Sequence, residues 1–157
     1  QMCIRDRVVS VLSVLLSLYA LRQATTKNTS DMYLFFISQY AKEDMKLALR
    51  KLKDIKRGVY RLEQWESDMK NNLPKAFEYD EARRLVKYFY DTLAYMKLEK
   101  LIEARFVRLI CLKKGAWLYL DTVEAMEKFF DSGYDKKPYA VIRDVCENLR
   151  KEGCCPP

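Results

Sequence analysis

The chain has 157 residues, of which 50% are hydrophobic and 32% charged, and it carries a formal net charge of +7. It contains no histidine, which excludes Ser-His-Asp and Cys-His catalysis, histidine-bearing zinc sites and the Glu-x-x-His pairs of di-iron bundles. Its four glycines are isolated, so neither a phosphate-cradling loop nor a dinucleotide fingerprint is present. The moderate positive balance suits an anionic membrane leaflet or nucleic acid.

The first seven residues read Gln-Met-Cys-Ile-Arg-Asp-Arg and resemble the translation of a transposase adaptor from a sequencing library. We interpret residues 1–7 as a non-native scar and exclude them from fold reasoning. The native sequence is then expected to begin upstream of the uncharged run that follows.

That run, Val8–Leu21, contains fourteen uncharged residues. As a helix it would extend about 21 Å, whereas a bilayer core of about 30 Å needs about 20 residues. If the scar replaced a longer start, the run is the remainder of a membrane span, and we predict a truncated transmembrane helix over residues 8–24. A signal-peptide core and an ordinary buried helix are the alternatives.

Three serines, Ser10, Ser13 and Ser17, align on one face of this predicted span. Small residues let membrane helices approach closely, so this face predicts packing between spans in a homodimer. The alternative is that each hydroxyl bonds back to the preceding turn of its own helix.

Basic residues dominate the sequence after the run. Arg22 and Lys27 come first, and eight more cations against three acids follow between residues 42 and 61. The positive-inside rule therefore predicts a single-pass protein of the cell inner membrane whose C-terminal part is cytoplasmic. Residues 25–31 are predicted to be a linker or a helix continuation, 32–152 a cytoplasmic helical domain, and 153–157 a tail.

Within this domain, apolar residues recur at three and four positions from Met32 to Lys56, which predicts one helix that stops at Gly58. A shorter helix is predicted from Tyr60 to Lys70. Asn71-Asn72-Leu73-Pro74 breaks it, because proline disfavours helix at the preceding residue. Asp80 is then predicted to cap a helix with one core-facing side, formed by Ala82, Leu85, Val86, Phe89, Leu93 and Met96.

The helical pattern allows a turn near Lys97–Lys100, and it ends at Lys113-Lys114-Gly115 with cations before a glycine. Two more helices are predicted, from Ala116 to about Phe130 and from Tyr139 to about Lys151. Asp131-Ser132-Gly133 and Pro138 lie in the loop between them. No segment reads as a strand. The predicted fold class is therefore all-α, a truncated transmembrane helix followed by a small helical bundle.

One basic stripe stands out in the first helix of the bundle. Its members recur at spacings of four, four, three and four, namely Lys42, Lys46, Arg50, Lys53 and Arg57. A helix with this stripe can lie against anionic phosphates, and lipid head groups of the inner leaflet are the simplest source. An ordinary solvated face is the alternative.

The remaining chemistry-bearing residues predict no catalytic, cofactor or metal site. Carboxylate pairs such as Asp121 with Glu124 share helix faces, but lysines and arginines surround them, as on solvated ion-pair faces. Cys111 and Cys146 lie in apolar helical patterns and are expected to be small buried hydrophobes.

A longer stretch, Phe77–Leu149, carries a family resemblance, particularly at 83–90, Leu98–Phe106, Trp117 and Tyr139–Leu149. Its motifs are apolar spacings with a tryptophan. The order of elements resembles an uncharacterised bacterial family, domain of unknown function 4760, whose members look like an N-terminal span followed by a small helical domain. The resemblance implies this architecture and no activity, so it carries over no functional residue.

Together these patterns predict a single-pass membrane protein whose cytoplasmic domain is a tether or regulatory interaction module. Its expected partners are the anionic inner leaflet and a protein partner or second copy. A nucleic-acid-binding helical module ranks second, because no recognition helix is evident. A carboxylate-based enzyme ranks third, so the chain is predicted not to be an enzyme.

Overall fold

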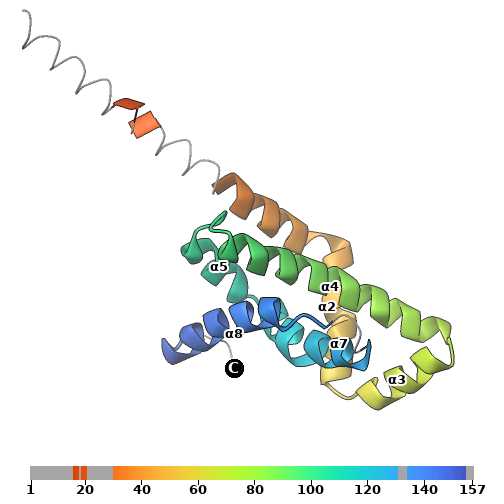
Figure 1. The fold of residues 1–157 in the computed structure, drawn as a ribbon. Coiled ribbons are helices and arrows are strands. Elements are labelled where there is room, and N and C mark those ends of the chain that lie inside the picture. Colours follow the sequence, from red (N-terminus) through yellow and green to blue (C-terminus); the bar gives the residue numbers. More distant parts are fainter. Residues whose placement is uncertain (1–15, 18, 21–29, 131–133, 155–157) are drawn as a thin grey trace, which may run out of the picture.

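The computed structural model describes residues 16–17, 19–20, 30–130 and 134–154. Across these ranges the regular structure is helical and contains no strand, which confirms the predicted all-α class. A helical segment over residues 30–41 comes before the labelled elements of Figure 1. These are α2 (Glu43–Lys56), α3 (Leu62–Lys70), α4 (Pro74–Leu98), α5 (Ala104–Cys111), α6 (Lys114–Leu118), the π-helical turn η1 (Tyr119–Val123), α7 (Glu124–Phe130) and α8 (Lys136–Lys151).

The membrane span is the main correction to the sequence-based picture. Among the described residues, no helix has both the length and the apolar character needed to cross a bilayer. This finding overturns the prediction of a single-pass inner-membrane protein with a cytoplasmic tether or regulatory module. Most of the predicted span, including Ser10 and Ser13, lies outside the described residues, as do residues 1–7.

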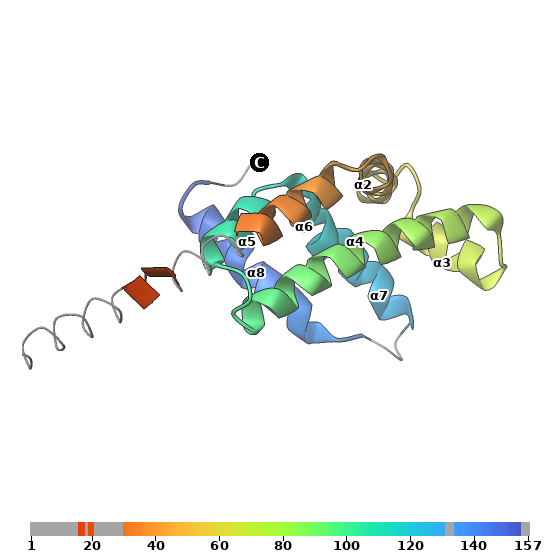
Figure 2. The same cartoon turned by 90° about the horizontal axis from the view of Figure 1, so that it is seen from above.

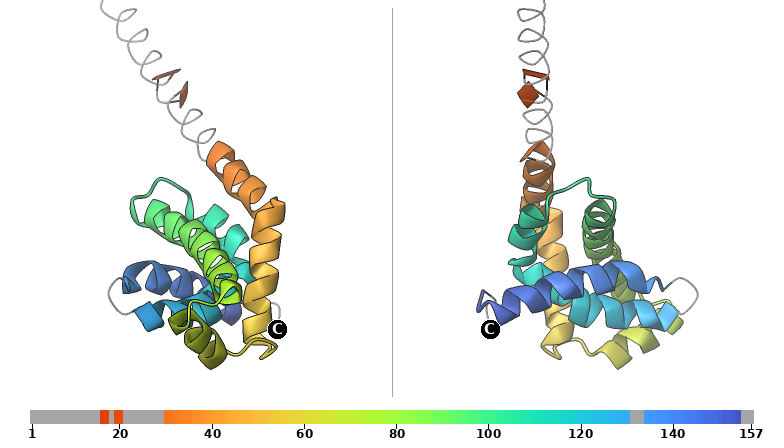
Figure 3. Two further views of the ribbon diagram at one scale, coloured as in Figure 1. Left: turned by 90° about the vertical axis from the view of Figure 1, so that its right-hand side faces the viewer. Right: turned by 60° about the vertical axis from the view of Figure 1, so that its left-hand side comes forward.

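The helix predicted from Met32 to Lys56 is divided in two at Lys42. Lys42 has an extended backbone, with ψ of 147°, and Figure 3 shows the change of direction between the 30–41 segment and α2. The new helix begins with Glu43 and Asp44, whose negative charges suit a helix N-terminus. The end of α2 is as predicted, because Gly58 adopts a left-handed conformation with φ of +74°.

The longest helix, α4, forms the centre of the fold. It packs against α2, α3, α5, η1 and α8, and Figures 1 and 2 show α3 near its first turns and α5 near its last. Pro74 occupies the start of α4, where its missing N–H costs no hydrogen bond. Asp80 is therefore inside the helix and is not the predicted cap.

The core face of α4 is largely as predicted. Val86, Phe89 and Leu93 are buried, whereas Leu85 is exposed and was wrongly assigned to the core. The predicted turn after this helix is confirmed, and Lys100 adopts a positive φ of 57° there. The core face of α4 also includes Tyr90, which begins a tyrosine stack. The ring of Tyr119 lies 5.1 Å from that of Tyr90 and 4.5 Å from that of Tyr139.

The predicted helix from Ala116 to Phe130 is also interrupted, because η1 lies between α6 and α7. After it, Asp135 caps α8 by accepting a hydrogen bond from the Lys137 N–H at 2.9 Å. Pro138 lies in the first turn of α8 and not in the predicted loop. A first-turn proline is tolerated because the N–H that it lacks would have no partner within the helix.

Gly115 marks the closest approach between helices. A Cβ atom there would lie 2.8 Å from the Tyr90 hydroxyl, 2.9 Å from the Tyr40 hydroxyl and 3.1 Å from a methyl group of Leu49. Its N–H donates to the Tyr40 hydroxyl at 3.2 Å. The glycine was predicted to end a helix, but it instead lies inside α6 and lets that helix reach its neighbours.

We expect Gly115→Ala to lower the free energy of unfolding by about 1–3 kcal/mol, because the added methyl group overpacks this contact. Urea unfolding followed by circular dichroism measures the change. The same substitution should cost less in a background with Tyr40→Phe and Tyr90→Phe, since both crowding hydroxyls are then absent. An equal cost in the two backgrounds would contradict this explanation.

Candidate functional site

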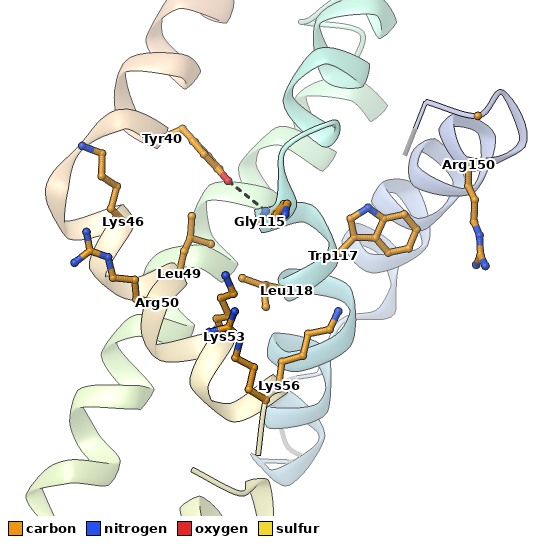
Figure 4. Close-up of a pocket in the computed structure, with 13 residues that line it drawn as sticks. Tyr40, Lys46, Leu49, Arg50, Lys53, Lys56, Gly115, Trp117, Leu118 and Arg150 are labelled. Carbon is orange, nitrogen blue, oxygen red and sulfur yellow. Dashed lines mark hydrogen bonds between the residues drawn. The ribbon is translucent and has the colours of Figure 1, made fainter. Parts of the chain in front are cut away.

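A pocket with a volume of about 900 Å³ opens between α2, α6 and the C-terminal end of α8. Figure 4 shows that its side chains come from facing elements, with α2 on one side and α6 and α8 on the other. Seven cations line it, which are Lys46, Arg50, Lys53, Lys56, Arg57, Lys114 and Arg150. No acidic residue is among the lining residues that the structure describes.

The few acids near this rim neutralise only part of its charge. Glu43 contacts Lys46 at 3.3 Å and Arg50 at 3.8 Å, and Asp121 contacts Lys56 at 2.5 Å. Within the described ranges, no ion pair involves the other four cations, Lys53, Arg57, Lys114 and Arg150. Such a concentration of one sign of charge in a concave surface attracts anions.

The remaining lining is mainly apolar or aromatic and consists of Tyr40, Leu49, Gly115, Trp117, Leu118 and Gly153. The hydroxyl of Tyr40 accepts the Gly115 hydrogen bond described above. Burial raises the pKa of Tyr40 above its usual value, and the hydrogen bond from Gly115 opposes that shift. The phenol is thus neutral at physiological pH and adds no negative charge to the pocket.

The structure retains most of the predicted basic stripe and extends it. Lys46, Arg50, Lys53 and Arg57 all line the pocket, whereas Lys42 does not, because it lies at the helix break. Sequence reasoning missed Lys56, which neighbours the stripe on α2 itself, and also Lys114 and Arg150, which reach the stripe through tertiary packing. The pair Lys113-Lys114, which comes shortly before Trp117, was visible in the sequence, but it was assigned to a helix end.

The predicted span-packing serines are not part of this pocket. Ser10 and Ser13 lie outside the described residues, and Ser17 is exposed within the short helical stretch at 16–17. Packing between spans through these serines therefore stays a prediction.

A second group of charges is buried among α4, α7 and α8. Asp80, Arg83, Glu124 and Glu127 are each no more than 7% exposed. The Arg83 Nε donates to Asp80 at 2.8 Å, and the same guanidinium pairs with Glu127. Arg84 contacts the other oxygen of Asp80 at 2.5 Å. Buried carboxylates need such cations, because an uncompensated charge is very costly in the interior.

Glu124 lies at the far end of this cluster. Its carboxylate accepts a hydrogen bond from the Tyr134 hydroxyl and another from Arg143 at 2.5 Å. Burial, together with the bond to Glu124, raises the pKa of Tyr134 to about 12. The assignment of Glu124 to a solvated face was wrong, although its predicted companion Asp121 is exposed.

The buried cluster has the character of a structural joint and not of an active site. Its carboxylates are held by cations or hydroxyls, and none of them lines the pocket. Over the parts of the chain that the structure describes, no group of three or more potential metal ligands is placed to hold an ion. The pocket is therefore the stronger candidate for function.

The two cysteines of the core behave as expected. Cys111 in α5 and Cys146 in α8 are both fully buried, which confirms their predicted role as small hydrophobes. A hydrogen bond to Cys146, and burial, raise the pKa of the Cys111 thiol. It therefore stays protonated and unreactive at neutral pH.

Comparisons of the chain with protein-family models, curated proteins and solved structures find no match. The resemblance to domain of unknown function 4760 and the adaptor origin of residues 1–7 stay predictions. Functional inference therefore rests on the geometry and charge of the pocket.

The buried cluster gives a direct stability test. Arg83→Met should lower the free energy of unfolding by about 3–5 kcal/mol, because Asp80 and Glu127 lose the cation that they share. The matched control is Arg84→Met, whose side chain is 63% exposed and should contribute about 1 kcal/mol or less. Urea unfolding of both variants would refute this role for Arg83 if the two losses were equal.

Proposed function

We propose that this protein binds a small phosphate-bearing ligand in the pocket between α2 and α6. The observation that carries the proposal is the set of seven cations, contributed by α2 and its C-cap and by α6 and α8, around a pocket with no acid among its described lining residues. Charge-assisted hydrogen bonds of this kind contribute about 1.5–3 kcal/mol each. Several of them acting together support micromolar affinity or better.

The shape of the site favours a small ligand over a flat charged surface. The cations surround a concavity whose volume lies within the range of about 300–1,000 Å³ typical of small-molecule sites. Lys42, the member of the predicted stripe that lies outside the pocket, would be equally useful on a flat lipid surface. Binding to the anionic leaflet remains the prediction from the stripe alone, and Lys42 separates the two hypotheses.

Calorimetric titration of the full chain with inorganic triphosphate tests the proposal. We expect saturable binding that weakens as salt is added, because mobile ions screen exposed charges. Lys53→Glu and Lys114→Glu should each reduce the affinity about tenfold or more, which corresponds to about 1.4 kcal/mol. These two lysines come from α2 and α6, so the pair tests whether both sides of the pocket are used.

Lys42→Glu is the matched control, because it reverses a charge of the same stripe outside the pocket. It should change the affinity several-fold less than Lys53→Glu does, because Lys42 is exposed, does not line the pocket and is screened by mobile ions. The absence of saturable binding would overturn the proposal. An effect of Lys42→Glu as large as that of Lys53→Glu would also do so, since it would assign binding to the outer face of α2.

A further inference from the structure

The two sides of the pocket differ in chemistry. In Figure 4 the labelled lysines and Arg50 belong to α2, whereas Trp117 and Arg150 lie on α6 and α8; Lys114 of α6 also lines the pocket. The α2 side thus offers a row of cations, whereas the other side adds an indole ring to the cations Lys114 and Arg150. A ligand that matches both sides has an anionic chain at one end and a flat ring at the other.

We infer that the ligand is a nucleotide, with its phosphates on the cations of α2 and its base stacked on Trp117. This inference rests on the proposed phosphate-binding function and adds the identity of the second half of the ligand. Base stacking on aromatic side chains is worth about 1–3 kcal/mol, and arginine adds cation–π attraction to ring systems.

Trp117 has the properties of a stacking platform. It is partly exposed and packs against the hydrophobic core, so the ring is supported from behind. Its buried Nε1 finds no hydrogen-bond partner in the described part of the chain. The protein therefore uses no hydrogen bond of this indole to hold its own fold, and a phenylalanine ring would preserve the packing.

The cation side has the reach for a chain of phosphates. Lys46 of α2 and Arg57, the C-cap residue of that helix, are eleven residues apart, which is about 16 Å along the helix axis. Lys53 lies between them, and Lys114 of α6 also lines the pocket. The aliphatic part of the lining is limited to Leu49 and Leu118 and the stems of the cations, which suits a compact ring better than a long alkyl tail.

The two tryptophans of the chain provide a direct test. Trp65 is fully buried in α3, whereas Trp117 lines the pocket, so a ligand stacked in the pocket should quench the fluorescence of Trp117. We would titrate the full chain with adenosine triphosphate, with inorganic triphosphate and with vesicles of phosphatidylglycerol. Calorimetry gives the affinities, and emission excited at 295 nm reports on the tryptophans.

The nucleotide should bind about tenfold or more tightly than inorganic triphosphate, as stacking of this strength implies. It should also quench emission, and Trp117→Phe should abolish the quenching while keeping most of the affinity. Trp117→Ala should reduce nucleotide affinity to that of inorganic triphosphate and leave the inorganic ligand unaffected. Thermal unfolding checks that each variant is folded, and the wild-type comparison of the two ligands holds without any variant.

The possible failures are distinguishable. Equal affinities for the nucleotide and inorganic triphosphate would overturn the nucleotide inference and leave the phosphate-binding function intact. Binding of neither ligand would overturn both. A third outcome is that the protein binds the vesicles but not the nucleotide. This outcome would assign the cations to lipid head groups and also overturn the inference.

Discussion

The approach of α6 to α2 and α4 at Gly115 is the constraint on which the pocket depends. Without a side chain at this position, the Tyr40 and Tyr90 hydroxyls and Leu49 all lie against the glycine. This contact holds Lys114 and Trp117 opposite the cations of α2. The site is therefore made by helix packing, and neither half forms the pocket without the other.

Burial of charge fixes the same central helix about two turns before Tyr90. Arg83 pairs in the interior with Asp80 of the same helix and with Glu127 of α7. A solvent-exposed ion pair would contribute little to stability. Buried pairs rarely add stability compared with apolar packing, but they strongly penalise any arrangement that separates them. Together with the tyrosine stack around Tyr119, they hold α7 and α8 in one register against α4.

Local patterns in the sequence were sufficient for the all-α class, for several of the helices and for half of the site. Apolar spacing located α3 and α8 closely, but it continued through Lys42 and concealed the break there, although Glu43 and Asp44 mark a helix start. Gly115 and Glu124 were misjudged because their roles come from distant residues that no local window contains. The pocket escaped prediction for the same reason, since Lys114 and Arg150 reach the stripe only after folding.

The π-helical turn η1 has a consequence for how this fold tolerates insertions and deletions. A π turn holds one residue more than an α turn, and each residue of an α-helix rotates the following side chains by about 100°. Removing one residue there would regularise the coil but turn α7 out of phase with α6. Glu124 and Glu127 would then swing away from Arg143 and Arg83. The extra residue of η1 thus keeps the carboxylates of α7 aligned with their cations, and a regular α-helix in place of η1 would make the fold less stable.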